Sequence, residues 1–197
     1  MVTLTLPDGA TKDFPKGTTV QQVADKLGVR DVVAGAVDGN PVDTFYAITQ
    51  DATLKLFKWE DKEGKEVLWH SAAHILAYAV QQLFPKAKNT IGPAIENGFY
   101  YDFDFGDYKL TEKDLERIEV KMKEIASQRL TYSKKTIPKE SVKKLFPTNE
   151  YKEEIADEYE EAGLTIYQMG DFADLCRGPH VPDTSVIKAM KLLSIAG

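Results

Sequence analysis

The chain of 197 residues is 43% apolar and 28% charged, the balance of a globular protein rather than of a disordered chain. Its net charge of −6 argues against indiscriminate nucleic-acid binding, and no apolar run reaches the roughly 18 residues that a membrane-spanning helix needs. A single cysteine excludes an internal disulfide, and the N-terminal residues do not resemble a signal peptide. We therefore expect a cytoplasmic protein with no membrane contact, built as one large domain or two small ones.

The first sixty residues predict a small β-rich module with one helix. Alternating apolar residues in 2–6 lead into a Pro-Asp-Gly turn, which indicates a hairpin. Residues 18–28 place threonines three positions before glutamines and end in glycine, as a capped helix does. A second hairpin turns at 38–40, and the apolar residues Leu54, Leu56 and Trp59 predict a last strand. This order of elements is typical of a ubiquitin-like β-grasp fold.

A charged stretch, 59–66, separates this module from the rest of the chain. We read it as a linker, or partly as the first turn of the second domain. The expected domains are therefore 1–61 and 62–197.

The second domain is predicted to be α+β, with an antiparallel sheet and a helix that carries histidines. The spacing of apolar residues, the helix-capping residues and the prolines and glycines that end elements predict its helices and strands. In chain order these are a helix 67–84 ended by Pro85, strands within 91–105, a long helix capped by Thr111, two shorter helical segments at 139–146 and 151–161, a strand at 164–169 and an apolar tail at 186–195.

All three histidines and the single cysteine fall into two matched pairs. His70 and His74 are four residues apart on the predicted helix, so both rings project from one face. Cys176 and His180 have the same spacing in a Gly/Pro-rich loop. Four nitrogen and sulfur ligands of this kind suit a tetrahedral zinc ion, so His70, His74, Cys176 and His180 form a candidate zinc site.

The same residues also suit hydrolysis without a metal. Imidazoles can activate water or donate protons, and an ester substrate also needs a donor for the developing oxyanion. Asp174 would point to the same side as Cys176 if that segment is extended. Tyr101 is expected to be a half-buried sheet aromatic, and nothing in the local pattern singles out Lys152.

Five lysines gather between residues 134 and 144. A solvated helix face and a phosphate-binding patch both explain such a cluster. The lysines concerned are Lys134, Lys135, Lys139, Lys143 and Lys144.

Three separated blocks together resemble bacterial threonyl-tRNA synthetases. They are His70–His74 (HSAAH), Ile91–Asp102 (IGPAIENGFYYD) and Asp174–Pro182 (DLCRGPHVP). The early segment Thr5–Gly9 (TLPDG) is similar to the start of that family's TGS module, a β-grasp domain. The resemblance covers essentially the whole chain and preserves the order of the blocks.

The resemblance implies that 62–197 is the domain that removes serine wrongly attached to threonine tRNA. Its catalytic residues would be His70, His74, Lys152, Asp174, Cys176 and His180, and its substrate contacts Tyr101, Asp174, Cys176 and His180. Lys152 enters only through this resemblance. The bacterial family edits without a metal, whereas related alanyl-tRNA synthetase domains bind zinc at similar positions, so we expect no metal here. If zinc were bound, the ligands would be His70, His74, Cys176 and His180.

The family's aminoacylation and anticodon-binding domains are expected to be missing from this chain. ATP and a catalytic zinc ion are needed only by the missing domains, so this chain is expected to require neither. The expected partner is the 3′ end of tRNA(Thr) carrying serine, not DNA. The full-length relatives are expected to be homodimers, and this piece a monomer.

The predicted reaction follows from the similarity of threonine and serine. A pocket gains only about 1–3 kcal/mol from the one methyl group that separates them, so a second, hydrolytic pocket restores fidelity. Three alternatives stay open: a zinc-binding hydrolase of unrelated substrate, a non-catalytic RNA-binding module, and a free-standing editing factor.

Overall fold

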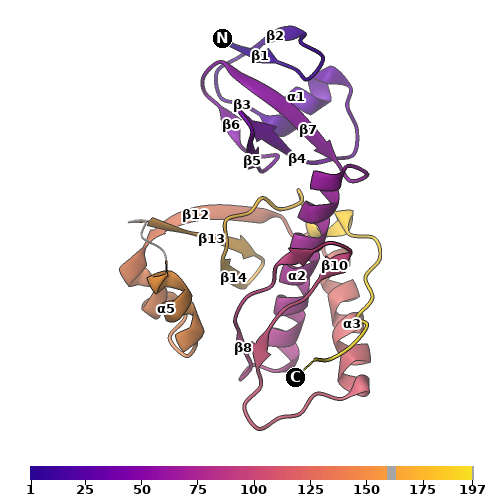
Figure 1. Ribbon diagram of the computed structural model, residues 1–197, viewed down its shortest axis with the longest axis vertical. Helices are drawn as coiled ribbons and strands as arrows, with labels where there is room; N and C mark the ends of the chain where they lie inside the picture. Colours follow the sequence, from indigo (N-terminus) through magenta and orange to yellow (C-terminus); the bar gives the residue numbers. More distant parts are fainter. Residues whose placement is uncertain (159–162, 197) are drawn as a thin grey trace. The chain divides into compact units, whose positions relative to one another are not determined.

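The computed structural model describes residues 1–158 and 163–196 of the chain (Figure 1). The chain forms two compact units. The first contains residues 1–68 together with 178–182, and the second contains 69–177 together with 183–197. Among the described residues, no helix has the length and apolar character needed to span a membrane.

The first unit is a mixed five-stranded sheet with one helix, as expected for a β-grasp fold. Its strands lie in the order β2-β1-β7-β4-β5, and β1 pairs in parallel with β7 while the other neighbours are antiparallel. A separate two-stranded ladder joins β3 to β6. The elements are β1 (Val2–Thr5), β2 (Thr11–Phe14), β3 (Thr18–Thr19), α1 (Val20–Leu27), β4 (Val32–Val37), β5 (Asn40–Val42), β6 (Ala47–Ile48) and β7 (Ala52–Lys58).

Local sequence signals account for the ends of these elements. The Thr19 side chain accepts from the backbone of Gln22 while the Gln22 side chain accepts from the backbone of Thr19, so the predicted capping box starts α1. Gly28 ends the helix in a left-handed conformation. The β4–β5 hairpin turns through Asp38 and Gly39, both with positive φ.

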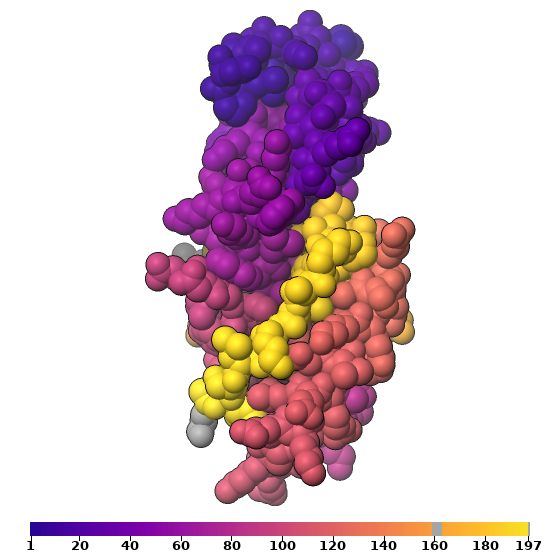
Figure 2. Space-filling view, turned by 90° about the vertical axis from the view of Figure 1, so that its right-hand side faces the viewer, coloured from indigo at the N-terminus to yellow at the C-terminus, as the bar shows by residue number. Residues whose placement is uncertain are grey.

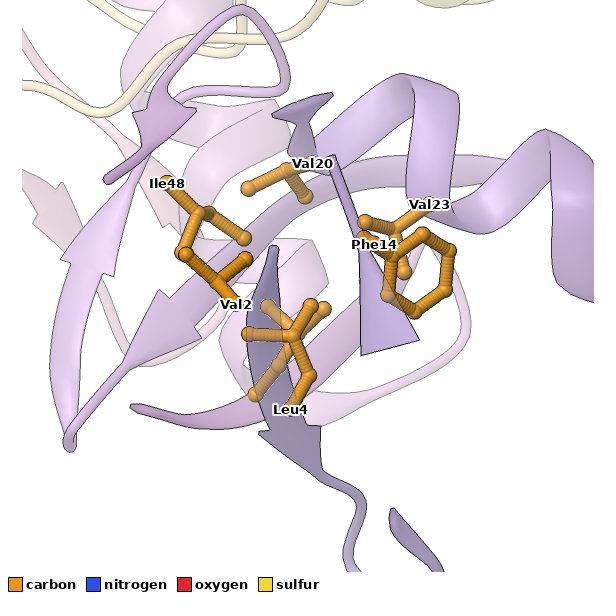
Figure 3. Packing of buried hydrophobic residues seen from close by; sticks show 7 residues of the cluster. Val2, Leu4, Phe14, Val20, Val23 and Ile48 are labelled. Atoms are coloured by element: carbon orange, nitrogen blue, oxygen red, sulfur yellow. The ribbon is translucent and has the colours of Figure 1, made fainter. Parts of the chain in front are cut away.

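An apolar core closes the first unit. Figure 3 shows side chains from β1, β2, β6 and α1 converging on one another. Each is almost completely buried, which makes this cluster the main source of stability in the unit. Its members are Val2, Leu4, Phe14, Val20, Val23, Ile48 and Leu54.

Of the two expectations for the charged stretch after β7, the structure supports the helical one in part: residues 59–61 form a turn, and 62–66 begin the next helix. β7 ends at Lys58, so Trp59, which was predicted to belong to the last strand, lies one residue beyond it and is half exposed. Helix α2 (Lys62–Leu83) begins five residues before the predicted start at residue 67. Lysine and glutamate are good helix formers, so the polarity of these residues marks an exposed first turn and not a break. Gly64 is required there, because a Cβ atom would lie 1.8 Å from the Lys58 carbonyl oxygen.

The second unit combines helices with small antiparallel sheets, which confirms the predicted α+β class. In Figure 1 the three-stranded sheet and α5 lie on one side of α2, and α3 lies on the other. The elements after α2 are β8 (Lys88–Asn89), β9 (Ala94–Ile95), β10 (Gly98–Phe99), β11 (Phe103–Asp104), α3 (Glu112–Ser127), β12 (Tyr132–Pro138), the 3-10 turn η1 (Lys139–Ser141), α4 (Val142–Leu145), α5 (Glu150–Asp157), β13 (Gly163–Met169), β14 (Phe172–Leu175) and the 3-10 turn η2 (Thr184–Val186).

The largest sheet of this unit has the order β12-β13-β14, with both pairs antiparallel. Only β13 was predicted as a strand from its apolar pattern. β12 has the sequence Tyr-Ser-Lys-Lys-Thr-Ile-Pro and exposes most of its side chains, so it shows no strand periodicity. β14 confirms that the segment before Cys176 is extended.

The segment 91–105 is less regular than predicted. Its alternation of aromatic and polar residues is real, but the ladders are only two residues long: β9 pairs with β10, and β8 pairs with β11. Pro93 has no N–H group, and the chain turns at Glu96 and Asn97, between β9 and β10, so a continuous ladder does not form.

Other expected elements are found with changed ends. Thr111 and Asp114 form the capping box of α3, as predicted. The segment 139–146 divides into η1 and α4, and α5 ends at Asp157, while residues 159–161 of the predicted helix lie outside the described part of the chain.

The apolar tail has no regular structure after η2, and it runs along the surface beside α3 (Figure 2). The buried Glu119 carboxylate of α3 holds it, accepting from the Lys191 ammonium at 2.9 Å and from the Leu192 N–H at 3.1 Å.

Candidate functional site

Two histidines of α2 face strand β14. His70 and His74 are one helical turn apart, and their ring centroids lie 4.9 Å from each other. His74 is buried and packs edge-on against Phe172 at the start of β14. The predicted placement of both imidazoles on one helix face is therefore confirmed.

Cys176 follows β14 and lies against the other histidine. Its backbone N–H donates to the Thr165 carbonyl on β13 at 3.0 Å, which continues the sheet pairing by one residue. The Cys176 Sγ atom lies 3.0 Å from His70 Nε2, at hydrogen-bond distance. Phe172 and Cys176 are on the same face of this extended segment, so one contacts His74 and the other contacts His70.

Asp174 and Lys152 form a buried ion pair beside these residues. Asp174 Oδ1 lies 2.5 Å from Lys152 Nζ, and each residue is only 1% exposed. Lys152 comes from the first turn of α5, and its ammonium also donates to the Thr90 carbonyl at 2.7 Å. A lysine so deeply buried is held by its partners rather than by solvent, and the local sequence pattern did not single it out.

Tyr101 and Asn89 complete the surroundings of the Asp174 carboxylate. The Tyr101 hydroxyl donates to Asp174 Oδ2, and the Asn89 amide donates to the same oxygen at 3.1 Å. Oδ1 also accepts from the Leu175 N–H at 2.8 Å. Tyr101 is not in a strand, contrary to the predicted sheet position, but its ring packs over Gly92, where a Cβ atom would lie 2.0 Å from the ring.

His180 lies in the segment 178–182, which belongs to the first unit. Its side chain is buried, and its backbone N–H donates to the Asp43 carboxylate at 2.9 Å. Along the chain it is four residues from Cys176. Its parts as a zinc ligand, a catalytic residue and a substrate contact stay predictions.

Burial keeps the histidines of α2 uncharged. It lowers the pKa of His70 from 6.5 to about 4, although the nearby Asp174 carboxylate raises it in part. Burial also lowers the pKa of His74 well below its usual value, and electrostatic repulsion of a second proton by His70 and by the Lys152 ammonium adds to this effect. The pKa of Tyr101 is raised well above its usual value by burial and by Asp174. At neutral pH the imidazoles are proton acceptors and the phenol is a donor.

The histidine and cysteine side chains of the second unit also fit a metal ion by type. The ligand atoms of His70, His74 and Cys176 all lie within 4.8 Å of one another. Two tetrahedral zinc ligands, one nitrogen and one sulfur, would lie about 3.5 Å apart at usual bond lengths. The 3.0 Å between His70 and Cys176 is shorter than this and fits a hydrogen bond, so zinc would need a small opening of the pair.

The lysine cluster is spread over β12, η1 and α4 rather than over one helix face. Lys134 donates to the Arg177 carbonyl, Lys139 pairs with Asp157 and Lys143 pairs with Glu153. Lys135 and Lys144 are exposed, with no ion pair among the described residues. Two of the five cationic groups are thus partly neutralised by acidic neighbours.

Three contributors to this site escaped sequence analysis: Asn89, the Thr90 carbonyl and Asn149. The Asn149 amide donates to the carbonyl and to the side-chain oxygen of Asn89, at 2.8 and 3.2 Å. Their one sequence signal is that Asn89 and Thr90 directly precede the Ile91-Gly92-Pro93 block.

Comparisons with known protein families match two separate parts of the chain. Residues 2–58 match the TGS domain, and residues 164–197 match the domain described as the threonyl and alanyl tRNA synthetase second additional domain.

Relatives that match almost the whole chain carry the name threonine–tRNA ligase. Those of Parabacteroides distasonis and Coxiella burnetii are each 46% identical over 100% of this chain and 31% of their own length. That of Thermotoga petrophila is 46% identical over 98% of this chain and 30% of its length. The chain therefore spans about a third of the length of these relatives. It belongs to the threonine–tRNA ligase family, within which it corresponds to a TGS domain followed by the second additional domain.

Proposed function

We propose that this chain is the proofreading part of a threonine–tRNA ligase and hydrolyses the ester that joins serine to tRNA(Thr). The observation that carries this proposal is the contact of His70 with Cys176, next to the buried Lys152–Asp174 pair, in a domain of this family. Ester hydrolysis needs a proton acceptor, a water molecule, a donor for the developing oxyanion and groups that orient the substrate. His70 is the candidate proton acceptor, and the other side chains are candidates for orienting the substrate.

In the proposed reaction, a water oxygen attacks the carbonyl carbon of the seryl ester. The uncharged His70 imidazole accepts the proton of this water, which its lowered pKa allows at neutral pH. The bond between the carbonyl carbon and the ribose oxygen then breaks, and the same proton passes to that oxygen. The products are free serine and tRNA with a free 3′ end, and no further reactant is consumed.

The remaining residues are proposed to hold the substrate. Asp174 and His180 would bind the seryl amine and hydroxyl, with Tyr101 as a further contact. Each carboxylate oxygen of Asp174 already accepts two hydrogen bonds. A substrate amine would therefore take the place of the Tyr101 or Asn89 donor. Lys152 directs two of its three N–H donors to Asp174 and the Thr90 carbonyl, so it would assist His70 through Asp174.

Cys176 is proposed to form the wall that rejects the extra methyl group of threonine. The discrimination available from one methyl group is about 1–3 kcal/mol, or roughly 10- to 200-fold in rate. This range is sufficient for a second selection step, because that step only has to hydrolyse seryl-tRNA(Thr) faster than threonyl-tRNA(Thr).

The proposed partner is the acceptor end of tRNA(Thr), in a cytoplasmic setting. Lys134, Lys135 and Lys144 are the exposed cations of the 134–144 cluster without an acidic partner among the described residues, and Lys134 also donates to the Arg177 carbonyl. Binding through few cations should be weak and should fall steeply with salt. ATP, a catalytic zinc ion and dimer formation would belong to the parent enzyme.

Deacylation of seryl-tRNA(Thr) and threonyl-tRNA(Thr) by the purified chain tests this function. We expect faster hydrolysis of the seryl ester, and at least about a 100-fold loss of rate in His70→Ala because a general base contributes that much. Lys152→Ala should lower the rate as well, and circular dichroism would verify that both variants fold. Lys113→Ala is the matched control for the loss of one lysine, because Lys113 is exposed on α3 and lies outside both the site and the 134–144 cluster. Undiminished rates in both site variants would refute the assignment.

A zinc-dependent version of the same reaction is the second candidate. The close set of ligand atoms from His70, His74 and Cys176 favours it, with His180 as the proposed fourth ligand. Metal analysis of protein prepared without chelator separates the two candidates. Near-stoichiometric zinc that is lost together with activity in Cys176→Ser would favour the metal, and full activity in excess chelator would favour the metal-free reaction.

A further inference from the structure

A pair of asparagine amides lies behind the Asp174 carboxylate, and hydrogen bonding fixes the direction of both. Asn149, at the N-terminal end of α5, is buried. Its Nδ2 donates to the Asn89 carbonyl and to Asn89 Oδ1, whereas its own Oδ1 is buried with no hydrogen-bond partner among the described residues. A flipped Asn149 amide would lose both bonds, so its nitrogen is held toward Asn89.

This donor in turn orients Asn89. With Oδ1 of Asn89 directed to Asn149, Nδ2 points to the opposite side, where it donates to the Tyr101 hydroxyl oxygen and to Asp174 Oδ2, each at 3.1 Å. Asn89 therefore presents only donors to the site.

The same contact fixes the Tyr101 hydroxyl. Its oxygen already accepts from Asn89, so its own hydrogen is directed to Asp174, with which it makes a close contact. A hydrogen-bonded chain of this kind has one polarity, in which each donor determines the role of the next group.

The first turn of α5 holds this segment at a second point. Lys152, three residues after Asn149, donates to the carbonyl of Thr90 and to the other oxygen of Asp174. The carbonyls of Asn89 and Thr90 thus both accept from α5 and its N-terminal end, which fixes the backbone on which the Asn89 amide stands.

We propose that Asn89 is a positioning residue of the proofreading site, which holds Asp174 and directs the Tyr101 hydroxyl, and that Asn149 sets the orientation of Asn89. This inference rests on the proposed function. It adds residues from outside the histidine and cysteine blocks, and their part is to fix the direction of hydrogen bonds and not to touch the substrate.

Asn89→Asp is the sharpest test, because it keeps the shape of the side chain and replaces its donors by a carboxylate facing Asp174. At pH 7.5 we expect kcat for seryl-tRNA(Thr) to fall about 10- to 100-fold with a smaller change in KM, since two like charges would share one site. As the pH is lowered toward 5, the new carboxyl takes up a proton and donates again. The ratio of variant to wild-type kcat should therefore recover.

Two further variants separate this effect from a structural one. Asn89→Ala should lower kcat by a ratio that does not change with pH. Asn97→Asp is the matched control, because Asn97 is exposed in the turn between β9 and β10 and its change should leave kcat intact.

A wild-type kcat at pH 7.5 in folded Asn89→Asp would overturn the inference, as would a loss that is the same at every pH. If Asn89→Asp does not fold at neutral pH, Asn89→Ala decides: a wild-type kcat overturns the proposal and a reduced one supports it. Inactivity of the wild-type chain would instead count against the proposed function. The contact itself is then tested by urea unfolding of Asn89→Ala, Tyr101→Phe and the double variant, where additive changes would overturn it and coupled changes would support it.

Discussion

The interiors of the two units differ in chemistry. Seven apolar side chains make up the core cluster of the first unit, and removing them from water stabilises it directly. The second unit also has apolar helix faces, but next to them it buries an ammonium, a carboxylate and an imidazole, in Lys152, Asp174 and His74. Burying such groups costs free energy even when they are paired. The first unit also buries Asp43 and His180, whereas the second buries an ion pair beside an imidazole. Buried, paired charges of this kind are common at functional sites, which supports the proposed site in the second unit.

The largest expected effect comes from breaking the buried pair. Lys152→Met leaves the Asp174 carboxylate without its cation and should lower the free energy of unfolding of the second unit by about 3–5 kcal/mol. Adding Asp174→Asn removes that charge and should restore most of the loss. Urea unfolding followed by hydrogen exchange in each unit measures both changes. A double variant no more stable than Lys152→Met would show that the ion pair is not the cause.

The corresponding test in the first unit shortens an apolar side chain of the core. Leu4 is completely buried, so Leu4→Ala should cost about 2–5 kcal/mol through lost burial and a cavity. Unlike the loss in Lys152→Met, this loss should be insensitive to pH between 5 and 8, because no charge is involved. Unfolding at both pH values checks this expectation, and a strong pH dependence would contradict the apolar description of the core.

The histidines of α2 predict a pH dependence specific to the second unit. The pKa of His70 is lowered in the folded state to about 4, so between pH 6.5 and 4 the unfolded chain binds a proton that the folded chain does not. Its contribution is fully present above about pH 6.5 and is lost as the pH falls toward 4, by an amount on the order of 3 kcal/mol. His74 acts in the same direction.

Unfolding of chelator-treated wild type and His70→Gln at pH 6.5 and 4.5 tests this prediction. The variant should lose less stability on acidification, because the remaining carboxylates titrate equally in both proteins. Equal losses would mean that His70 titrates in the folded state as it does in water.

The smallest expected effect should be the same in both units. Thr19 and Thr111 each start a helix through a capping box, so Thr19→Ala and Thr111→Ala should each cost about 1 kcal/mol. Thr→Ser at either position keeps the hydroxyl and serves as the control. Clearly unequal costs in thermal unfolding would show that these caps depend on their surroundings.

Elements with strong local signals were predictable, and those held by distant partners were not. The capping boxes at Thr19 and Thr111 and the Asp38-Gly39 turn involve neighbours in sequence, and the structure confirms them. The exposed strand β12 is formed by its partner β13 and has no apolar period of its own. The polar start of α2 was left open between a linker and a helical turn, because charge indicates exposure, which helices and linkers share.

The residues of the candidate site also divide into those that the sequence indicated and those that it did not. The repeated four-residue spacing indicated that the imidazoles of His70 and His74 and the Cys176 thiol belong together, and the structure places these three within 4.8 Å. The Asp174 carboxylate gains its other partners from Lys152, Tyr101 and Asn89, which are 22, 73 and 85 residues away along the chain.

The sequence by itself determined the class of fold, the start and end signals of the main helices, and the residues with reactive side chains. Only the tertiary structure decided which of these side chains are buried and which act as hydrogen-bond donors or acceptors. It also decided which asparagine and lysine residues without a sequence motif lie beside them. Spacing along a helix or strand is set by backbone geometry that every residue shares, whereas hydrogen-bond partners and loss of water depend on segments brought together by packing.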